Sequence, residues 1–373
     1  MKKKVIAAGH ICLDITPVFP NKEVTEVSEI LQPGKLIEMG NANVHTGGSV
    51  ANTGLGMKVL GADVSLMGKV GNDAFGDMIL SILHKYGAEK QMIRSASEST
   101  SYSVVLAIPG IDRIFLHNPG ANHSFSADDI SMNELREASL FHFGYPPLMK
   151  NMYWNKGEEL LAVLKKAKKA GCATSLDMAS VDADSDAGKA DWNQILKKVI
   201  PVTDFFVPSV EELCFMLDRF RFEEWQKRAN GKDITEVIEI ESDVIPLANQ
   251  CMEYGAKVLV IKCGAAGMYF RTAEKEAMKE LTEKLGLDVL EWADKEGFEK
   301  SYVPDKLLSG TGAGDTSIAA FLASVLEGNS LENCMHLAAA AGASCVTAYD
   351  ALSGLKPLNE LKAKIASGWE KYK

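Results

Sequence analysis

The segment GTGAGD at residues 310–315 combines three glycines with a carboxylate, and the apolar pattern TSIAAFLASVLEG predicts a helix directly after it. Such glycines let the backbone adopt conformations closed to other residues and bring N–H groups close to a ligand. Free N–H groups and the positive end of the dipole at a helix start stabilise an anion that forms there. Asp315 would stand beside that anion as a candidate base, an arrangement that suits phosphoryl transfer. The alternative is an ordinary glycine-rich turn with an acidic first helical turn.

Two other phosphate-binding motifs fit the sequence poorly. A dinucleotide fingerprint needs GxGxxG near the start of a βαβ unit, whereas the third glycine here comes one residue early and close to the end of the chain. The Gly68–Lys69 pair resembles a P-loop, but Asp63 stands where its first glycine belongs and Val70 where a hydroxyl would hold magnesium. A nicotinamide cofactor and Walker-type ATP binding are therefore disfavoured.

Composition limits the class of protein. The 373 residues suffice for one large α/β domain with additions or for two domains, and 46% hydrophobic with 24% charged residues is typical of a soluble globular chain. The net charge of -10 disfavours nucleic-acid binding, which needs a basic face. An anionic substrate would have to be met by local donors or by a metal such as magnesium, because the overall field would repel it.

Cysteine usage and the N-terminus indicate the compartment. The seven cysteines are odd in number and scattered without a CxxC pair, which predicts reduced cytosolic thiols. The apolar run after MKKK is interrupted by His10 and ends at Asp14 without a small-residue cleavage site, so a signal peptide is disfavoured. No apolar run approaches the roughly 20 residues needed to cross a bilayer. We expect a cytoplasmic protein without a membrane partner.

Helix and strand patterns alternate along the chain and predict a mostly parallel sheet with helices on both faces. Residues 4–13 are predicted as a buried first strand with Asp14 at its carboxyl end, the edge of such sheets where ligands bind. Strand-like pieces within residues 15–46 and 100–122 predict a small projecting sheet that could act as a lid. Two charged segments are predicted as surface additions: residues 218–250 and 271–300.

A second glycine-rich region, HTGGSVANTGLGMKVLGADVSLMGKVGNDAFGD, lies between Asp14 and the GTGAGD turn. Together these residues resemble the ribokinase-like (PfkB) carbohydrate kinase family. Further matches follow in family order over nearly the whole chain: PGK at 33–35, PGAN at 119–122, SLD at 175–177, PSVEE at 208–212 and KCGAAG at 262–267. The resemblance implies one kinase domain over residues 1–373, a three-layer α/β/α sandwich with a mostly parallel central sheet and a small β-sheet lid.

The resemblance also implies roles for individual residues. Asp315 would be the base that accepts the proton of the substrate hydroxyl, with an anion hole formed by the backbone of Gly312, Ala313 and Gly314. The implied sugar-binding residues are Asp14, Gly47, Gly48, Asn52 and Asn122. For Asn52 the alternative is a helix-start residue without a ligand, and for Asn122 an Asx turn within the lid.

On the nucleotide side the resemblance implies ATP and Mg²⁺ as cofactors. The matching nucleotide-binding residues are Ser209, Lys262, Gly264 and Gly267, and the matching magnesium residues are Glu212 and Asp177. Plain alternatives are a solvated lysine, a surface glutamate and a helix-capping aspartate. Ser309 stands where the family usually has Asp, which leaves a monovalent-cation site in doubt, and Ser209 replaces a usual Asn.

The function predicted from these residues is ATP-dependent phosphorylation of a hydroxyl of a small sugar. A nucleoside kinase of the same fold is the first alternative, and a pocket of Phe19, Tyr102, Phe115 and His117 would favour it. A catalytically weak sugar-binding protein is the second, because Ser309 and Ser209 depart from the family pattern. The exposed edges of the lid strands predict a homodimer that pairs through the lid.

Overall fold

The protein is built around an eight-stranded sheet, seen in a computed structural model that describes residues 3–111 and 113–372. The strand order is β14-β13-β12-β11-β10-β9-β1-β4; the strands from β12 to β4 pair in parallel, and β13 and β14 pair antiparallel. Their bounds are β1 Lys4–Gly9, β4 Asp63–Met67, β9 Leu140–Gly144, β10 Ala173–Asp177, β11 Phe205–Phe206, β12 Val258–Lys262, β13 Gly267–Thr272 and β14 Glu296–Lys300.

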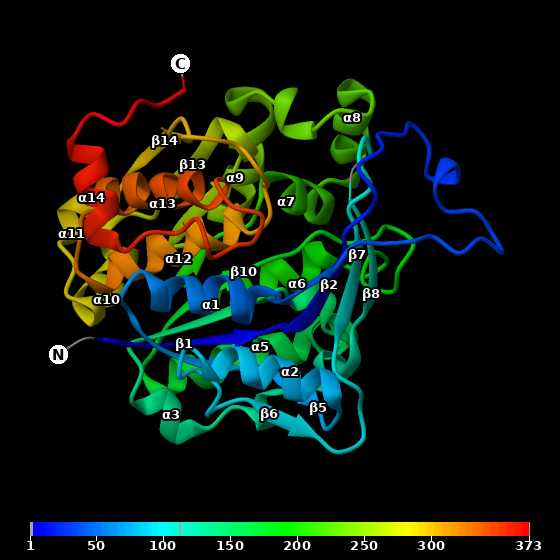
Figure 1. Ribbon diagram of the computed structural model, residues 1–373. Helices are drawn as coiled ribbons and strands as arrows, with labels where there is room; N and C mark the ends of the chain where they lie inside the picture. Colours follow the sequence, from blue (N-terminus) through cyan, green and yellow to red (C-terminus); the bar gives the residue numbers. More distant parts are fainter. Residues whose placement is uncertain (1–2, 112, 373) are drawn as a thin grey trace.

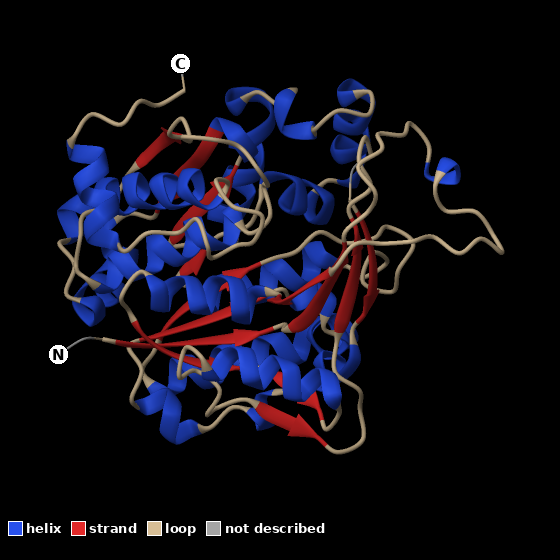
Figure 2. Ribbon diagram, in the orientation of Figure 1, coloured by secondary structure: helices blue, strands red, loops and turns tan. Residues whose placement is uncertain are grey.

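Helices cover both faces of this sheet (Figure 2). One face carries α1 Ser49–Val59, α2 Ala74–His84, α10 Lys275–Leu285, α11 Val289–Trp292, α12 Ala313–Leu326, α13 Leu331–Cys345 and α14 Leu358–Ala366. The other carries α3 Met132–Arg136, α4 Lys150–Tyr153, α5 Glu158–Ala170, α6 Trp192–Val199, α7 Val210–Leu217, α8 Arg219–Ala229 and α9 Ile245–Glu253.

The central strands supply side chains to two separate cores. In β1, Val5 and Ala7 join one apolar cluster, while Ile6 and Ala8 join the other. This division follows from the two-residue period of a strand, and it needs apolar residues at every position because both faces are covered. The continuous apolar runs of the sequence therefore form buried strands, which confirms the predicted three-layer arrangement.

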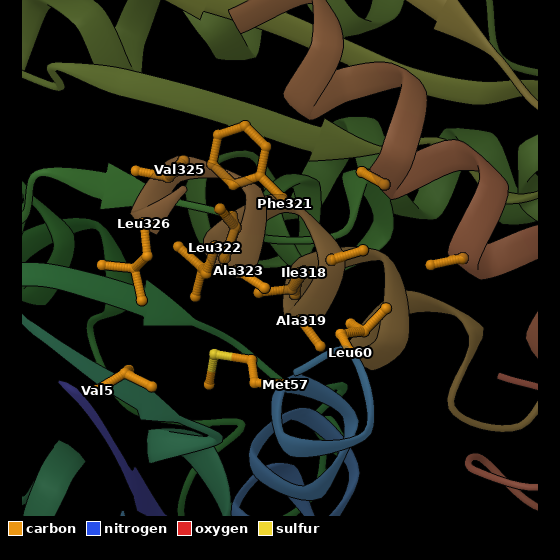
Figure 3. Packing of buried hydrophobic residues seen from close by; sticks show 14 of the residues in the cluster. Val5, Met57, Leu60, Ile318, Ala319, Phe321, Leu322, Ala323, Val325 and Leu326 are labelled. Atoms are coloured by element: carbon orange, nitrogen blue, oxygen red, sulfur yellow. The ribbon is translucent and has the colours of Figure 1, made fainter. Parts of the chain in front are cut away.

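Close packing between α1 and α12 fixes the start of α12 relative to the sheet. Figure 3 shows Met57 and Leu60 from the α1 segment against the apolar side chains of α12. A methyl group at Gly56 would stand 3.1 Å from the Cβ of Ala319, so a side chain there would push the two helices apart. Helix α12 has no exposed face after its first turn, because every residue from Asp315 to Leu326 is buried.

The lid is a four-stranded sheet in the order β3-β2-β7-β8, formed by β2 Cys12–Pro17, β3 Ala42–Gly47, β7 Tyr102–Leu106 and β8 Ile114–Asn118. Figure 1 shows β1 running from the N-terminus toward this lid sheet. The prediction of one strand over residues 4–13 was wrong, since the chain leaves the central sheet after Gly9. Gly9 has a φ of 128°, and a methyl group there would stand 2.2 Å from the Gly144 carbonyl oxygen. Asp14 therefore lies on a lid strand rather than at the end of β1.

Between β2 and β3 the chain forms a long excursion instead of further strands. It contains one short 3₁₀ helix, η1 Val27–Glu29, and projects beyond the lid in Figure 1. Phe19 and Val24 pack with Ile108 of the β7–β8 connection in a small core of their own. Asp112, within the predicted hairpin turn, lies outside the described residues. A further two-stranded sheet pairs β5 Lys69–Gly71 with β6 Ile93–Ser95.

The two segments predicted as surface additions both contribute to the core. Residues 218–250 form α8, the 3₁₀ helix η7 Ile234–Glu236, the π-helical turn η8 Ile240–Val244 and the start of α9. Residues 271–300 end β13 and form α10, α11 and the edge strand β14. Trp225 of the first segment and Trp292 of the second are completely buried, so both segments complete the sandwich.

Two predictions from composition can be compared with the fold. All seven cysteines are buried and unpaired. Across residues 3–111 and 113–372, no helix combines the length and apolar character that a bilayer span requires.

Candidate active site

Asp315 lies in the first turn of α12 and is only 5% exposed. Its carboxylate accepts hydrogen bonds from three side chains. Asn52 Nδ2 donates to Oδ2 at 3.0 Å, Thr53 Oγ1 donates to Oδ1 at 3.1 Å, and the Tyr145 hydroxyl lies 2.8 Å from both oxygens. Hydrogen bonds to an ionised carboxylate are strong and directional, so the base is held in a defined orientation.

The turn before α12 leaves backbone N–H groups at the start of the helix, close to Asp315, unpaired within the part of the chain that the structure describes. Gly312 caps the helix with a φ of 76°, and a methyl group there would stand 2.3 Å from the Cβ of Ala351. The N–H groups of Gly312 and Gly314 donate to no acceptor in the described residues, whereas the Ala313 N–H donates to the Gly310 carbonyl at 3.2 Å. Two of the three predicted anion-hole donors are therefore free, and the third is engaged within the turn.

The turn before α12, the candidate phosphate-binding segment, is held by contacts within itself and by one contact from the lid. The Ser309 hydroxyl accepts the Thr311 N–H at 3.1 Å, so Ser309 closes the turn. The guanidinium of Arg113, in the connection before β8, donates to the Thr311 hydroxyl. The lid thus contacts the turn that precedes α12.

Tyr145 is a site residue that the sequence interpretation missed. It follows β9 directly and has a φ of 66°, a left-handed conformation uncommon for a residue with a large side chain. Burial, together with the charges of Asp315 and Asp177, raises the pKa of its hydroxyl, so the group remains a donor to Asp315. The sequence offered one indication that Tyr145 belongs to the site: it follows a predicted strand and so falls at the carboxyl edge of the sheet.

Asp177 and Lys262 form a buried ion pair beside the start of α12. Lys262 Nζ lies 2.8 Å from Asp177 Oδ1, and the Lys262 side chain passes close to Gly314. Burial raises the pKa of Asp177 to about 8; Lys262 opposes this shift, whereas Glu212 and Asp315 add to it. Burial alone would lower the pKa of Lys262, but the carboxylates around it outweigh that effect and raise it.

These carboxylates fit a magnesium ion that arrives with a nucleotide. Asp177 Oδ2 is buried without a hydrogen-bond partner in the described part of the chain, and Glu212 contributes a second nearby negative charge. Among the described residues, no three Asp, Glu, His or Cys side chains converge into a complete metal site. Mg²⁺ is typically held by one or two carboxylates with substrate phosphates and water, so an incomplete protein site is the expected form.

The remaining residues predicted on the nucleotide side have clear local roles. Ser209 is the N-cap of α7: its Oγ accepts the Glu212 N–H at 3.2 Å, and Glu212 Oε2 accepts the Ser209 N–H at 2.8 Å. Ser209 also bridges to Lys262 at the end of β12. Gly264 and Gly267 both have positive φ, and Gly267 passes too close to Glu299 for any side chain.

On the predicted substrate side, Asp14 and the glycine pair lie close together. Asp14 Oδ1 accepts from the Cys12 thiol at 3.2 Å, and a methyl group at Gly47 would overlap the Asp14 carboxylate. Burial raises the pKa of Asp14, although hydrogen bonds from Cys12 and Ser103 oppose the shift. Gly48 has a φ of 84° and caps α1, whose Asn52 reaches Asp315. Helix α1 thus links the two halves of the site.

Asn122 occupies a different place from the other predicted sugar contacts. It is completely buried, its Nδ2 donates to the Ile11 carbonyl at 2.8 Å, and its Oδ1 accepts the Ile11 N–H at 3.2 Å. Nδ2 also donates to the Pro119 carbonyl at 3.1 Å. These bonds hold the connection between β1 and β2 in place and leave no exposed polar atom for a ligand.

The aromatic pocket that would favour a nucleoside is not formed by the four residues considered. Phe19 lies in the small core of the excursion, Tyr102 packs edge-on against Phe75 at 5.4 Å, and Phe115 is 57% exposed. Of the four, only His117 lies beside the site, through its contact with His10 at a ring distance of 5.2 Å.

A buried carboxylate at an open helix start, next to a lysine and further carboxylates on an α/β sandwich, defines the class as an α/β phosphotransferase. The sequence model for the pfkB family carbohydrate kinase matches residues 11–357. The chain therefore belongs to the pfkB family and is a carbohydrate kinase, as the ordered motifs implied.

Individual relatives are distant but cover the whole chain. The chain is 23% identical over 376 residues to 5-dehydro-2-deoxygluconokinase of Clostridium perfringens, with 100% of this chain and 95% of that protein covered. The structure of Arabidopsis thaliana ribokinase complexed with ribose and ATP matches with a TM-score of 0.68 at 20% identity, covering 97% and 98% of the two chains. A putative ribokinase II from E. coli in complex with ATP and Mg²⁺ matches with a TM-score of 0.70 at 21% identity, covering 98% and 99%. These likenesses show the ribokinase fold.

Proposed function

We propose that this carbohydrate kinase transfers the γ-phosphoryl group of ATP to a hydroxyl of a small sugar, with Asp315 as the base. The observation that carries the proposal is the setting of Asp315, whose carboxylate is oriented by Asn52, Thr53 and Tyr145 at the open start of α12. A base placed within reach of a hydroxyl can accept its proton as the oxygen attacks phosphorus.

Charge that develops on the transferred group is met by groups on this chain. The N–H groups of Gly312 and Gly314 face the same region as the positive end of the α12 dipole. Lys262 adds an ammonium group beside Gly314. Asp177 and Glu212 would hold Mg²⁺, which when bound with ATP neutralises phosphate charge.

The sugar would lie between Asp315 and the lid. Asp14 can accept from two neighbouring hydroxyls, and Gly47 and Gly48 let the backbone come close to the ring. The ribokinase that shares this fold was solved with ribose and ATP, and another relative is named a kinase of a dehydro-deoxy sugar acid. We assign Asn122 to supporting Ile11 rather than to contacting the sugar.

The test is the substitution Asp315→Asn, assayed for ADP release with ATP, Mg²⁺ and a panel of sugars and nucleosides. We expect kcat to fall by about 10² to 10⁴-fold with little change in the KM for the sugar, because the amide keeps the shape but cannot accept the proton. Asp305→Asn is the matched control, since Asp305 is exposed and pairs with Lys364 on the surface. Near-normal turnover by Asp315→Asn would exclude the base role.

The same panel separates the candidate functions. Phosphorylation of nucleosides but not sugars would replace the proposed substrate class, and no ADP release with any compound would favour a binding protein. Scattered aromatic residues in the lid support a sugar over a nucleoside.

We also propose a cytoplasmic homodimer. Seven unpaired cysteines suit a reducing compartment. The lid sheet has β3 and β8 as its edge strands, and Phe115 and Leu116 of β8 are 57% and 54% exposed. Open strand edges with apolar side chains favour pairing with a second copy. A monomer measured by light scattering at assay concentration would contradict the lid-paired dimer.

A further inference from the structure

His10 is a buried histidine whose ring has no hydrogen-bond partner among the described residues. It is 1% exposed, and both Nδ1 and Nε2 are buried without a hydrogen-bond partner in the described part of the chain. Buried polar groups in folded proteins are nearly always paired, so an unpaired imidazole calls for an explanation. His142, on the neighbouring strand β9, shows the usual situation: its Nδ1 lies 3.0 Å from Ser175 Oγ and its Nε2 3.4 Å from Ser49 Oγ.

The backbone holds His10 in a fixed position between β1 and β2. Its N–H donates to the Gly144 carbonyl at 3.2 Å, and its carbonyl accepts the Val50 N–H at 3.1 Å. The ring nitrogen Nδ1 is directed at Gly48, where an added methyl group would stand only 2.6 Å away. The glycine pair of the sugar side therefore comes close to this imidazole.

The surroundings of His10 belong to both halves of the site. The Tyr145 ring, whose hydroxyl binds Asp315, lies 6.3 Å from the His10 ring. The ring of His117, from lid strand β8, lies 5.2 Å from the His10 ring. His117 is bonded to Ser103 at 3.0 Å, and Ser103 stands opposite Asp14 in the lid. Polar side chains thus form a continuous arc from Asp14 to Asp315, with His10 in its middle.

We propose that His10 hydrogen-bonds a hydroxyl of the sugar other than the one that is phosphorylated, and so helps to select the substrate. This inference rests on the proposed function. A neutral imidazole offers one donor and one acceptor, which matches the one donor and the lone pairs of a hydroxyl. Burial lowers the pKa of His10, and His117 and His123 add to the effect, so the ring is neutral at neutral pH.

The position of His117 explains how a buried ring can meet a substrate. His117 is carried by the lid and its ring lies 5.2 Å from that of His10, so a lid movement that separated the two rings would uncover the imidazole. Tyr145 connects the two positions, because its ring lies 6.3 Å from that of His10 and its hydroxyl donates to Asp315.

The experiment combines protein and substrate changes. The sugar with the highest kcat/KM in the panel, and each of its monodeoxy analogues, is assayed with the wild type, His10→Leu and His10→Gln. We expect His10→Leu to raise the KM for the parent sugar about tenfold, as for the loss of one hydrogen bond. In the wild type, the analogue that lacks the hydroxyl bound by His10 should have a kcat/KM about tenfold below that of the parent sugar. In His10→Leu, the same analogue and the parent sugar should have equal kcat/KM. His10→Gln, which keeps a donor and an acceptor, should recover part of the loss.

His142→Leu is the matched control, because it also replaces a buried histidine but should keep the wild-type penalty for every analogue. If His10→Leu and every deoxy analogue lower kcat/KM by independent factors that multiply, the ring contacts no substrate hydroxyl. It then binds an enclosed water or nothing, and the inference is wrong. A ¹⁵N NMR spectrum of the wild type with the sugar alone avoids any folding defect of the variants. We expect the His10 ring signals to shift, and unchanged signals would also overturn the inference. If no sugar is phosphorylated at all, the proposed function fails first.

Discussion

Two buried aspartate–lysine clusters occupy opposite ends of the central sheet and behave in opposite ways. At the amino end, Asp204 lies just before β11, 2.6 Å from Lys168 Nζ and 3.0 Å from Lys257 Nζ, and it accepts the Thr174 N–H at 2.9 Å. At the carboxyl end, Asp177 has one lysine and one oxygen without a partner. Burial alone would raise the pKa of Asp204, but its two lysines outweigh that effect and lower it, whereas the pKa of Asp177 rises to about 8.

The difference separates a carboxylate that suits a role in stability from one that suits a role in binding. A buried carboxylate stabilises a fold only when its charge and lone pairs are satisfied. Asp204 meets that condition with protein groups alone. Asp177 is surrounded by more negative than positive charge, an environment that an added cation would complete. The carboxyl edge of a parallel sheet is also where ligands bind in open α/β folds.

The largest effect we expect comes from breaking the satisfied cluster. Asp204→Ala should lower the free energy of unfolding by about 3 kcal/mol, because it leaves two lysines and the Thr174 N–H without their partner. Urea unfolding followed by circular dichroism measures this change. As a control, Asp305→Ala removes an exposed partner of Lys364 and should change stability by less than about 0.5 kcal/mol. Equal stability of Asp204→Ala and the wild type would show that the cluster contributes nothing.

A substitution in the unsatisfied cluster should instead reduce activity without reducing stability. Asp177→Asn should lower kcat/KM about 100-fold, because the amide cannot supply the charge that Mg²⁺ needs. Its stability should not fall below that of the wild type, since a neutral group replaces a carboxylate that burial disfavours. A variant that keeps its activity but loses several kcal/mol of stability would place Asp177 in the same class as Asp204.

The sequence predicted the class of fold, but it did not reveal the path of the chain at every strand end. The glycine turn at residues 310–315 does precede a helix, as its local pattern predicted, whereas Asp14 and the glycine pair were proposed from the family resemblance and not from a local pattern. The apolar run of residues 4–13, by contrast, suggested one strand, because its pattern does not reveal the positive φ of Gly9. The lid was predicted with the right strands on each side, but most of residues 18–41 form an excursion stabilised by a contact with Ile108.

Two residues have roles that depend on tertiary contacts and that no local pattern reveals. Tyr145 adopts a left-handed conformation that propensity would assign to Gly or Asn, and its partner Asp315 lies 170 residues away. Asn122 matched a family motif, yet its amide is bonded to Ile11, which is 111 residues away. The motif does not reveal this bond, and only the folded structure shows which groups the amide contacts.

The last effect we expect is on the pH dependence of stability, where the two clusters should differ in sign. The lowered pKa of Asp204 adds stability that is present above the ordinary carboxyl value near 4 and is lost as the pH falls through the native value. The wild type should therefore lose stability more steeply below about pH 5 than Asp204→Asn does.

The raised pKa of Asp177 makes stability depend on pH in the opposite direction. Its contribution is present below the unfolded value and is lost as the pH rises toward about 8, so Asp177→Asn should flatten the stability curve between about pH 4 and 8. Urea titrations of the three proteins at closely spaced pH values measure both limbs. If all three curves run parallel, neither carboxylate differs between the folded and unfolded states, and the contrast between the two ends of the sheet loses its electrostatic basis. If only the acid limb changes, Lys262 compensates the charge of Asp177 fully, and the need for an external cation at the carboxyl edge disappears with it.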